Sequence, residues 1–175
     1  MFDVRRRMAM VSGIGVEPTL SPVMIGTIDL PEDVAVWDPG LLALSDGRPS
    51  QKSRIPLPAA CVPGPYDVLA YQRSRLELIA VVVRRPAVKV TRWQSLGIGM
   101  DGHLVIAPAA FAGVIEFPGR PEGLPADARA WIHLARLADA RPFVWIEDPA
   151  GVPAMRGWVG LDASALVAAI VIEMV

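Results

Sequence analysis

The stretch that decides the fold is residues 64–86, which read GPYDVLAYQRSRLELIAVVVRRP. In its first half, every second residue from Tyr66 to Ala70 falls on one face, which is the period of a β-strand over 66–73. In its second half, residues 76–83 are apolar at nearly every position, which predicts a strand that is covered on both faces. The two runs together predict a buried β-sheet at the centre of the molecule.

Short apolar runs surround this centre. The chain has 17 proline and 15 glycine residues, and such punctuation favours many short strands over long helices. Further strands are expected over 23–30, 34–37, 88–93, 103–107, 114–117, 143–146 and 166–174. Residues 55–65 should be extended but poorly paired, because proline donates no ladder hydrogen bond. The alanines of the last run would also suit a helix, but Val171 and Ile172 favour a strand.

One helix is expected, near residues 127–140. Pro125 and Asp127 are typical of a helix start, and Pro142 would end it. Most of the helix surface would be apolar, which indicates that the helix packs onto a sheet.

The predicted fold is therefore mainly β, with antiparallel sheets arranged as a β-sandwich or in a barrel-like way, and with this one packed helix. A chain of 175 residues suits one globular domain. Residues 1–20 are a candidate N-terminal arm of that domain.

Composition excludes several classes of protein. A hydrophobic content of 53% is too high for a disordered chain, and a net charge of −1 argues against non-specific binding of nucleic acid. The single cysteine, Cys61, rules out an internal disulfide and permits a reducing compartment. No apolar run reaches the roughly 20 residues that span a bilayer. We therefore expect a cytoplasmic protein that binds neither nucleic acid nor membranes.

Composition and the N-terminal residues also indicate the origin of the protein. Only Lys52 and Lys89 among the 17 basic residues are lysine, and alanine, valine and proline are abundant, as in high-GC bacterial genomes. Arginines at 5–7 precede a short apolar run, as in a signal peptide, but glycines interrupt the run and no small-residue cleavage site follows. A bacterial protein without a secretory signal is the favoured interpretation.

Four segments carry a resemblance to a known family. They are WDP at 37–39, VPGPYDV at 62–68, RWQSLGIGMDG at 92–102 and GWVGLDA at 157–163. Together they resemble a bacterial family known only as a domain of unknown function, with a strand start of proline, glycine and tyrosine followed by two Trp strands that lead to Gly-x-Asp. The resemblance implies a mainly β fold and no established activity. Because genes of such families can neighbour toxins, it also implies an interaction role of the immunity type.

Asp101 and His103 are the best-placed pair for chemistry. At positions i and i+2 of a strand they share a face, and a histidine beside a carboxylate can bind metal or act as a base. A zinc site needs three or four ligands, so a second carboxylate such as Asp67 or Asp162 would have to join them. The simpler interpretation is a turn aspartate with a histidine at the rim, and no metal or cofactor is expected.

Other polar groups have a structural interpretation beside the functional one. The face of Arg129, His133 and Arg136 could bind an anion, but a solvated face is favoured. Cys61 has no histidine at useful spacing, and an active nucleophile needs an adjacent base or cation.

An acidic segment surrounds Pro31. Its carboxylates, on Asp29, Glu32 and Asp33, could hold Ca²⁺, but an exposed turn is favoured. No nucleophile elbow, dinucleotide fingerprint or phosphate-binding loop is present in the sequence.

Two similar turns suggest where a ligand would bind. Segments 99–107 and 160–168 each run from glycine through aspartate into an apolar strand, as in turns where Asp binds its own backbone and a small residue adopts left-handed dihedral angles. If these turns lie at the same end of a sheet, they bring Asp101 and His103 close to Trp158, Arg156 and Asp162.

Tryptophan is the other indication of a binding surface. Trp37 and Trp158 lie beside turns and are the predicted surface pair, whereas the remaining tryptophans belong to apolar runs and are expected in the core. The predicted binding residues are thus Trp158, Arg156, Asp162 and Trp37.

Two hypotheses about function follow. The first is a non-enzymatic binding or protein-interaction module, with an unknown protein partner or with self-association, because no catalytic constellation is complete. The alternative is a small hydrolase or metal-dependent enzyme centred on Asp101 and His103.

Overall fold

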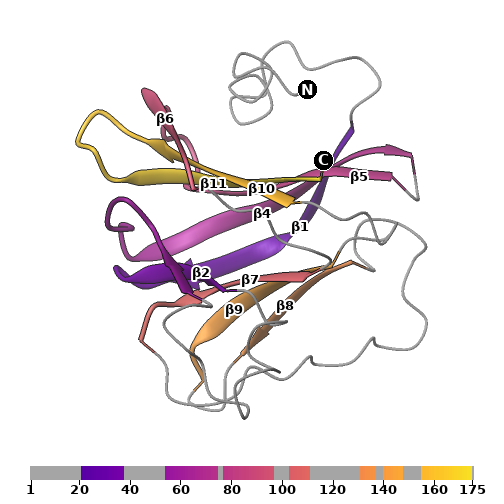
Figure 1. The fold of residues 1–175 in the computed structure, drawn as a ribbon, viewed down its shortest axis with the longest axis horizontal. Helices are drawn as coiled ribbons and strands as arrows, with labels where there is room; N and C mark the ends of the chain where they lie inside the picture. Colours follow the sequence, from indigo (N-terminus) through magenta and orange to yellow (C-terminus); the bar gives the residue numbers. More distant parts are fainter. Residues whose placement is uncertain are drawn as a thin grey trace.

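The strands that the structure describes form two antiparallel sheets, which lie as two layers (Figure 1). The computed structural model describes residues 21–37, 54–74, 77–96, 103–110, 131–136, 140–147 and 155–174. Within these ranges the elements are β-strands, and none of them is a helix. Of the two architectures expected from the sequence, two packed sheets is therefore the one observed.

The larger sheet has six strands. Their order across the sheet is β1 (Ser21–Leu30), β4 (Gly64–Ser74), β5 (Glu77–Arg84), β11 (Val167–Met174), β10 (Met155–Leu161) and β6 (Arg92–Ser95). At its centre Val82 pairs with Leu69 on β4 and with Val171 on β11. Residues 81–83 have no exposed area, which confirms that this strand is covered on both faces.

The smaller sheet has five strands. Their order is β3 (Arg54–Pro56), β2 (Val34–Trp37), β7 (His103–Pro108), β9 (Pro142–Glu147) and β8 (Ile132–Arg136). In Figure 1, β7, β8 and β9 lie in one layer, and β4, β5, β10 and β11 lie in the other.

A single hydrophobic core fills the space between the sheets. Alternation along each strand sends every second side chain into this space. The core includes Ile28, Tyr66, Val68, Ile170 and Ile172 from the larger sheet and Val36, Leu104, Ile106, Val144 and Ile146 from the smaller one. One core shared by both sheets is the arrangement of a single domain.

The opposite face of each sheet is also apolar and buried. On the larger sheet Leu69, Tyr71 and Val82 form a second cluster with Trp93 and Trp158 packed against it. On the smaller sheet a third cluster contains Trp37, Val105, Phe143 and Trp145. The described residues therefore form three apolar layers rather than one.

Gly26 allows the two sheets to approach each other at one edge. It lies at an irregularity in the pairing of β1 with β4. A Cβ atom at this position would lie 2.7 Å from the Cδ1 atom of Leu134 on β8. A side chain at position 26 would therefore require the exposed side chain of Leu134 to shift.

The helix predicted near 127–140 is wrong. Ile132–Arg136 form β8, which pairs antiparallel with β9. The segment is apolar on most sides, so it satisfies the period of a strand as well as that of a helix. Pairing with β9 decides between them, because Ile132 then enters the core between the sheets and His133 lies opposite Trp145.

Most of the other predicted strands are confirmed. Those expected over 23–30, 34–37, 66–73, 76–83, 103–107, 143–146 and 166–174 correspond to β1, β2, β4, β5, β7, β9 and β11. The strand expected over 88–93 is only partly correct, because β6 begins at Arg92. Residues 57–63 are poorly paired as expected, with a single bridge from Cys61 to Val167, whereas residues 55 and 56 belong to β3 and residues 64 and 65 begin β4 and pair with β1.

Some predictions fall on residues outside the described ranges. These are the arm over 1–20, the strand over 114–117 and the start of the predicted helix at Pro125 and Asp127. In the part of the chain that the structure describes, no helix has the length and apolarity needed to cross a membrane.

Candidate functional site

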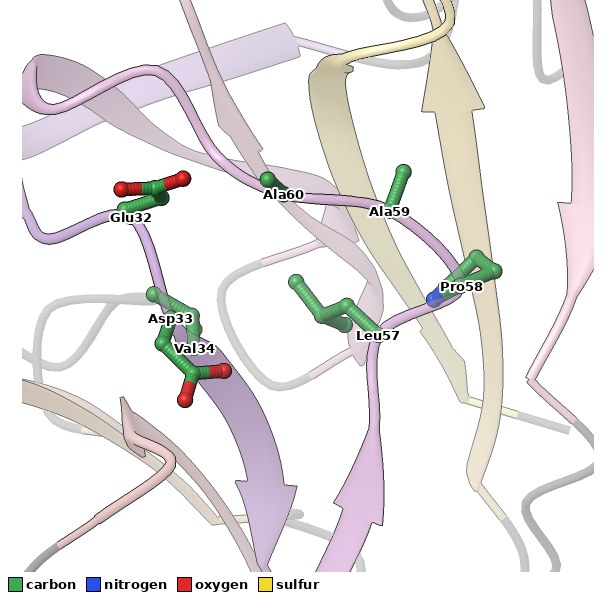
Figure 2. Close-up of a pocket in the computed structure, with 7 residues that line it drawn as sticks. All are labelled: Glu32, Asp33, Val34, Leu57, Pro58, Ala59 and Ala60. Carbon is green, nitrogen blue, oxygen red and sulfur yellow. The ribbon is translucent and has the colours of Figure 1, made fainter.

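A hollow of about 430 Å³ opens between the turn before β2 and the segment after β3. It is lined by Glu32, Asp33, Val34, Leu57, Pro58, Ala59 and Ala60. Figure 2 shows Glu32 and Asp33 on one side, with Leu57, Pro58 and Ala59 on the other. The side chains of Glu32 and Asp33 are exposed. The hollow thus places two carboxylates opposite an apolar wall.

Proline shapes both sides of this hollow. Pro31 follows the last residue of β1, so the acidic pair lies in the turn that leads into β2. On the other side, Pro56 ends β3 and Pro58 lies in the wall itself. Because proline cannot donate a ladder hydrogen bond, strand β3 ends here, and residues 57–60 line the hollow without continuing the strand.

Backbone hydrogen bonds hold the two sides in place. The Cys61 N–H donates to the carbonyl of Glu32 at 2.9 Å, and the Ala109 N–H donates to the carbonyl of Asp33 at 2.9 Å. On the apolar side, the Val167 N–H donates to the carbonyl of Ala60 at 2.9 Å. Both sides are thereby attached to the body of the sandwich.

A polar cluster, formed by buried Cys61 and Tyr66 together with partly buried Arg85 and Asp162, lies next to the hollow. Tyr66 has no exposed area. Its hydroxyl oxygen accepts the N–H of Val62 at 3.2 Å, and its proton is within reach of the carbonyls of Val62 at 3.2 Å and Val167 at 3.4 Å. Burial raises the pKa of the Tyr66 hydroxyl above its ordinary value.

The thiol of Cys61 is held in its protonated form. Burial raises its pKa from 9.0 to about 11, against the opposing effects of a hydrogen bond with Tyr66 and the charge of Arg85. Nucleophilic chemistry requires the thiolate. The arrangement around Cys61 therefore favours a structural role for this residue.

Asp162 organises the turn between β10 and β11. Its Oδ1 atom accepts the N–H groups of Ser164 at 2.8 Å and Leu166 at 3.1 Å. Its Oδ2 atom accepts the Arg85 guanidinium at 2.9 Å. The Leu166 N–H, followed by Arg85 and Ser164, holds the pKa of Asp162 below its ordinary value.

The structure confirms that this segment is a turn in which Asp binds its own backbone. The left-handed residue is Ala165, with φ of 59°. The carboxylate of Asp162 is thus engaged within the fold.

The predicted binding residues on β10 lie on the outer face of the larger sheet. Trp158 is half-buried, and its Nε1–H donates to the Oε2 atom of Glu173 at 3.0 Å. Glu173 is only 1% exposed, and exposed Arg156 pairs with it in register. Sequence reasoning did not single out Glu173, because one glutamate near the end of an apolar strand gives no motif.

Two predicted surface positions are wrong. Trp37 is 4% exposed and belongs to the apolar cluster on the outer face of the smaller sheet. His133 is 8% exposed rather than solvated, since β8 places it opposite Trp145. Arg136 is exposed and donates to the carbonyl of Ala140 at 2.9 Å, whereas Arg129 lies outside the described residues.

The strands into which the two similar segments run, β7 and β11, lie in different sheets. His103 is the first residue of β7 in the smaller sheet, whereas Trp158 and Asp162 belong to, or follow, β10 in the larger one. Asp101 lies outside the described residues. Asp67 lies on β4, where it pairs with Thr27 and Arg84.

No metal centre is found among the residues that the structure describes. Within those ranges, no group of three or more histidine, cysteine, aspartate or glutamate side chains is arranged to hold a metal ion. The acidic segment Asp29, Glu32 and Asp33 therefore forms no such group. Glu32 and Asp33 instead lie in an exposed turn, which was the favoured interpretation.

Comparison with known proteins adds no function. No family model, no curated protein and no solved structure matches this chain. None of these comparisons supports the expected resemblance of the four segments to a bacterial family. The hollow and the polar cluster beside it are therefore the candidate functional site.

Proposed function

We propose that this protein is a non-enzymatic interaction module, and that the hollow binds a lysine or arginine side chain presented by a protein partner. The observation that carries the proposal is the pairing of two exposed carboxylates with an apolar wall across one hollow (Figure 2).

The two sides of the hollow suit the two parts of such a side chain. Lysine and arginine combine an aliphatic stem with a charged head, and the stem packs on apolar surface while the head stays in water. Leu57, Pro58 and Ala59 offer the apolar surface, and Glu32 and Asp33 offer the opposite charge. The volume of about 430 Å³ is in the lower part of the range for ligand sites.

The expected strength of this contact is modest. Exposed ion pairs contribute roughly 0.2–1 kcal/mol each, so the two pairs alone would give one side chain in the hollow a Kd of about tens of millimolar or weaker. A stable complex would need further contacts around it. The hollow would then select for a basic residue at one position of a larger interface.

The test is an NMR titration of the isotopically labelled protein with the peptide acetyl-Gly-Lys-Gly-amide. We expect shifts at the backbone amides of residues 32, 33 and 57–61, because these surround the hollow. The matched peptide with glutamate in place of lysine should leave these signals unchanged. Equal responses to both peptides, or no response to either, would contradict the proposal.

Two variants distinguish binding in the hollow from a general attraction of the basic peptide to acidic residues. In Glu32→Gln with Asp33→Asn, the shape is kept and the charge is lost, so the response to the lysine peptide should disappear. Asp29→Asn removes one exposed charge from the same segment without touching the hollow, and it should respond like the wild type.

A further inference from the structure

Three consecutive residues link the apolar wall of the hollow to three different parts of the fold. The carbonyl of Ala60 accepts the N–H of Val167 on β11, and the N–H of Cys61 donates to the carbonyl of Glu32. Val62 contacts the hydroxyl of Tyr66 on β4 through both its N–H and its carbonyl. We call residues 60–62 the link, because they connect the acidic side of the hollow with its apolar side.

Only one of these three attachments is made by a side chain. Tyr66 has no exposed area, and its ring belongs to the core between the sheets. Packing therefore fixes the position of the hydroxyl on β4, and the link is attached to it through Val62. Buried polar groups in native proteins have hydrogen-bond partners, so removal of the hydroxyl would leave both backbone groups of Val62 without this partner.

We infer that the Tyr66 hydroxyl is a positioning group for the hollow. It holds the link in place, so that the carboxylate of Glu32 and the wall of Leu57, Pro58 and Ala59 keep their separation before a partner arrives. A site that is ordered in advance avoids the entropic cost of ordering it during binding. The attachment of the link by Tyr66 does not depend on the proposed function of the hollow, whereas its effect on peptide binding rests on that function.

The experiment compares Tyr66→Phe with Tyr71→Phe by amide hydrogen exchange. Both residues lie on β4 and both are buried, but Tyr71 belongs to the cluster on the outer face of the sheet. In Tyr66→Phe we expect the amides of Cys61 and Val62 to exchange about tenfold faster, as for loss of one partly buried hydrogen bond. Core amides such as those of Val81 and Val82 should keep their rates, and Tyr71→Phe should leave the link unchanged.

The same variants are then titrated with acetyl-Gly-Lys-Gly-amide. Tyr66→Phe should bind the peptide about threefold more weakly than the wild type, while Tyr71→Phe should bind it normally. Unchanged exchange at Val62, or faster exchange spread over all core amides, would overturn the inference. Local loosening without any loss of peptide affinity would also overturn it, because the link would then have no effect on the hollow.

Two features keep the test decisive. If the wild type does not bind the peptide, the proposed function fails, while the exchange comparison still decides whether Tyr66 holds the link. If Tyr66→Phe does not fold, the wild type alone provides the answer. Its Tyr66 hydroxyl proton should be visible by NMR with a nuclear Overhauser effect to the Val62 amide, and absence of that contact would overturn the inference.

Discussion

Two turns in the described part of this protein contain carboxylates and use them differently. One is the turn after β10, with Asp162, and the other is the turn before β2, with Glu32 and Asp33. Asp162 accepts two backbone N–H groups and the Arg85 guanidinium, so its charge is engaged inside the fold. In the turn before β2, the fold uses the backbone carbonyls of Glu32 and Asp33 and leaves their side chains exposed. The comparison separates an aspartate that stabilises the fold from carboxylates that face a hollow.

Cys61 lies between these two regions, and its reactivity gives the largest expected effect. Its N–H binds the carbonyl of Glu32, and its bridge partner Val167 follows the Asp162 turn. A pKa of about 11 in place of 9.0 reduces the thiolate fraction about a hundredfold near neutral pH. Native protein should react with iodoacetamide at least about a hundredfold more slowly than urea-unfolded protein. Similar rates in the two states would show that the region between the turns is open.

Removal of the Asp162 side chain should destabilise the fold. Asp162→Ala loses two hydrogen bonds to the backbone and leaves Arg85 without this carboxylate, which we expect to cost about 1–2 kcal/mol. Asp162→Asn keeps an acceptor for the two N–H groups and should lose less. The measurement is urea unfolding, and a wild-type midpoint for Asp162→Ala would contradict the structural role of this turn.

Acid should remove part of the same stabilisation. Because the folded-state pKa of Asp162 lies below its unfolded value of about 3.8, the stabilisation is fully present above that value and is lost as the pH falls through the folded-state pKa. The free energy of unfolding of the wild type should therefore fall more steeply below about pH 4 than that of Asp162→Asn. Parallel curves for the two proteins would show that the carboxylate is not engaged in the fold.

The smallest effect on stability is expected at the acidic pair. Glu32→Gln with Asp33→Asn should change the free energy of unfolding by less than about 0.5 kcal/mol, because both side chains are exposed and their backbone contacts remain. The same urea titration measures it, with Asp29→Asn as control. A loss as large as that of Asp162→Ala would make the two turns alike and remove the distinction on which the proposed function depends.

The same contrast shows how far the sequence alone can go. The strands at 66–73 and 76–83 could be predicted because their patterns are local, with alternation in one and continuous apolarity in the other. The turn at Asp162 could be predicted because its hydrogen bonds join residues two and four positions apart. The predicted helix near 127–140 is wrong over 132–136 because a run that is apolar on most sides fits both periods, and only pairing with the next strand, β9, decides between them.

The hollow could not be predicted in the same way. It depends on contacts between Glu32 and Cys61 and between Ala60 and Val167, which are far apart along the chain. The sequence contains its parts, an acidic segment around Pro31 and a proline-rich stretch after 54, but no spacing rule joins them. Tyr66 shows the same limit, since alternation places its ring in the core but does not indicate which backbone groups its hydroxyl meets.

The central claim is that exposed carboxylates in the hollow, and not acidity in general, bind a basic side chain. The most direct measurement is the NMR titration with acetyl-Gly-Lys-Gly-amide on the wild type, on Glu32→Gln with Asp33→Asn, and on Asp29→Asn. The account predicts shifts around the hollow in the wild type and in Asp29→Asn, and none in the double variant. Shifts of equal size in all three proteins, or their absence from the wild type, would contradict it.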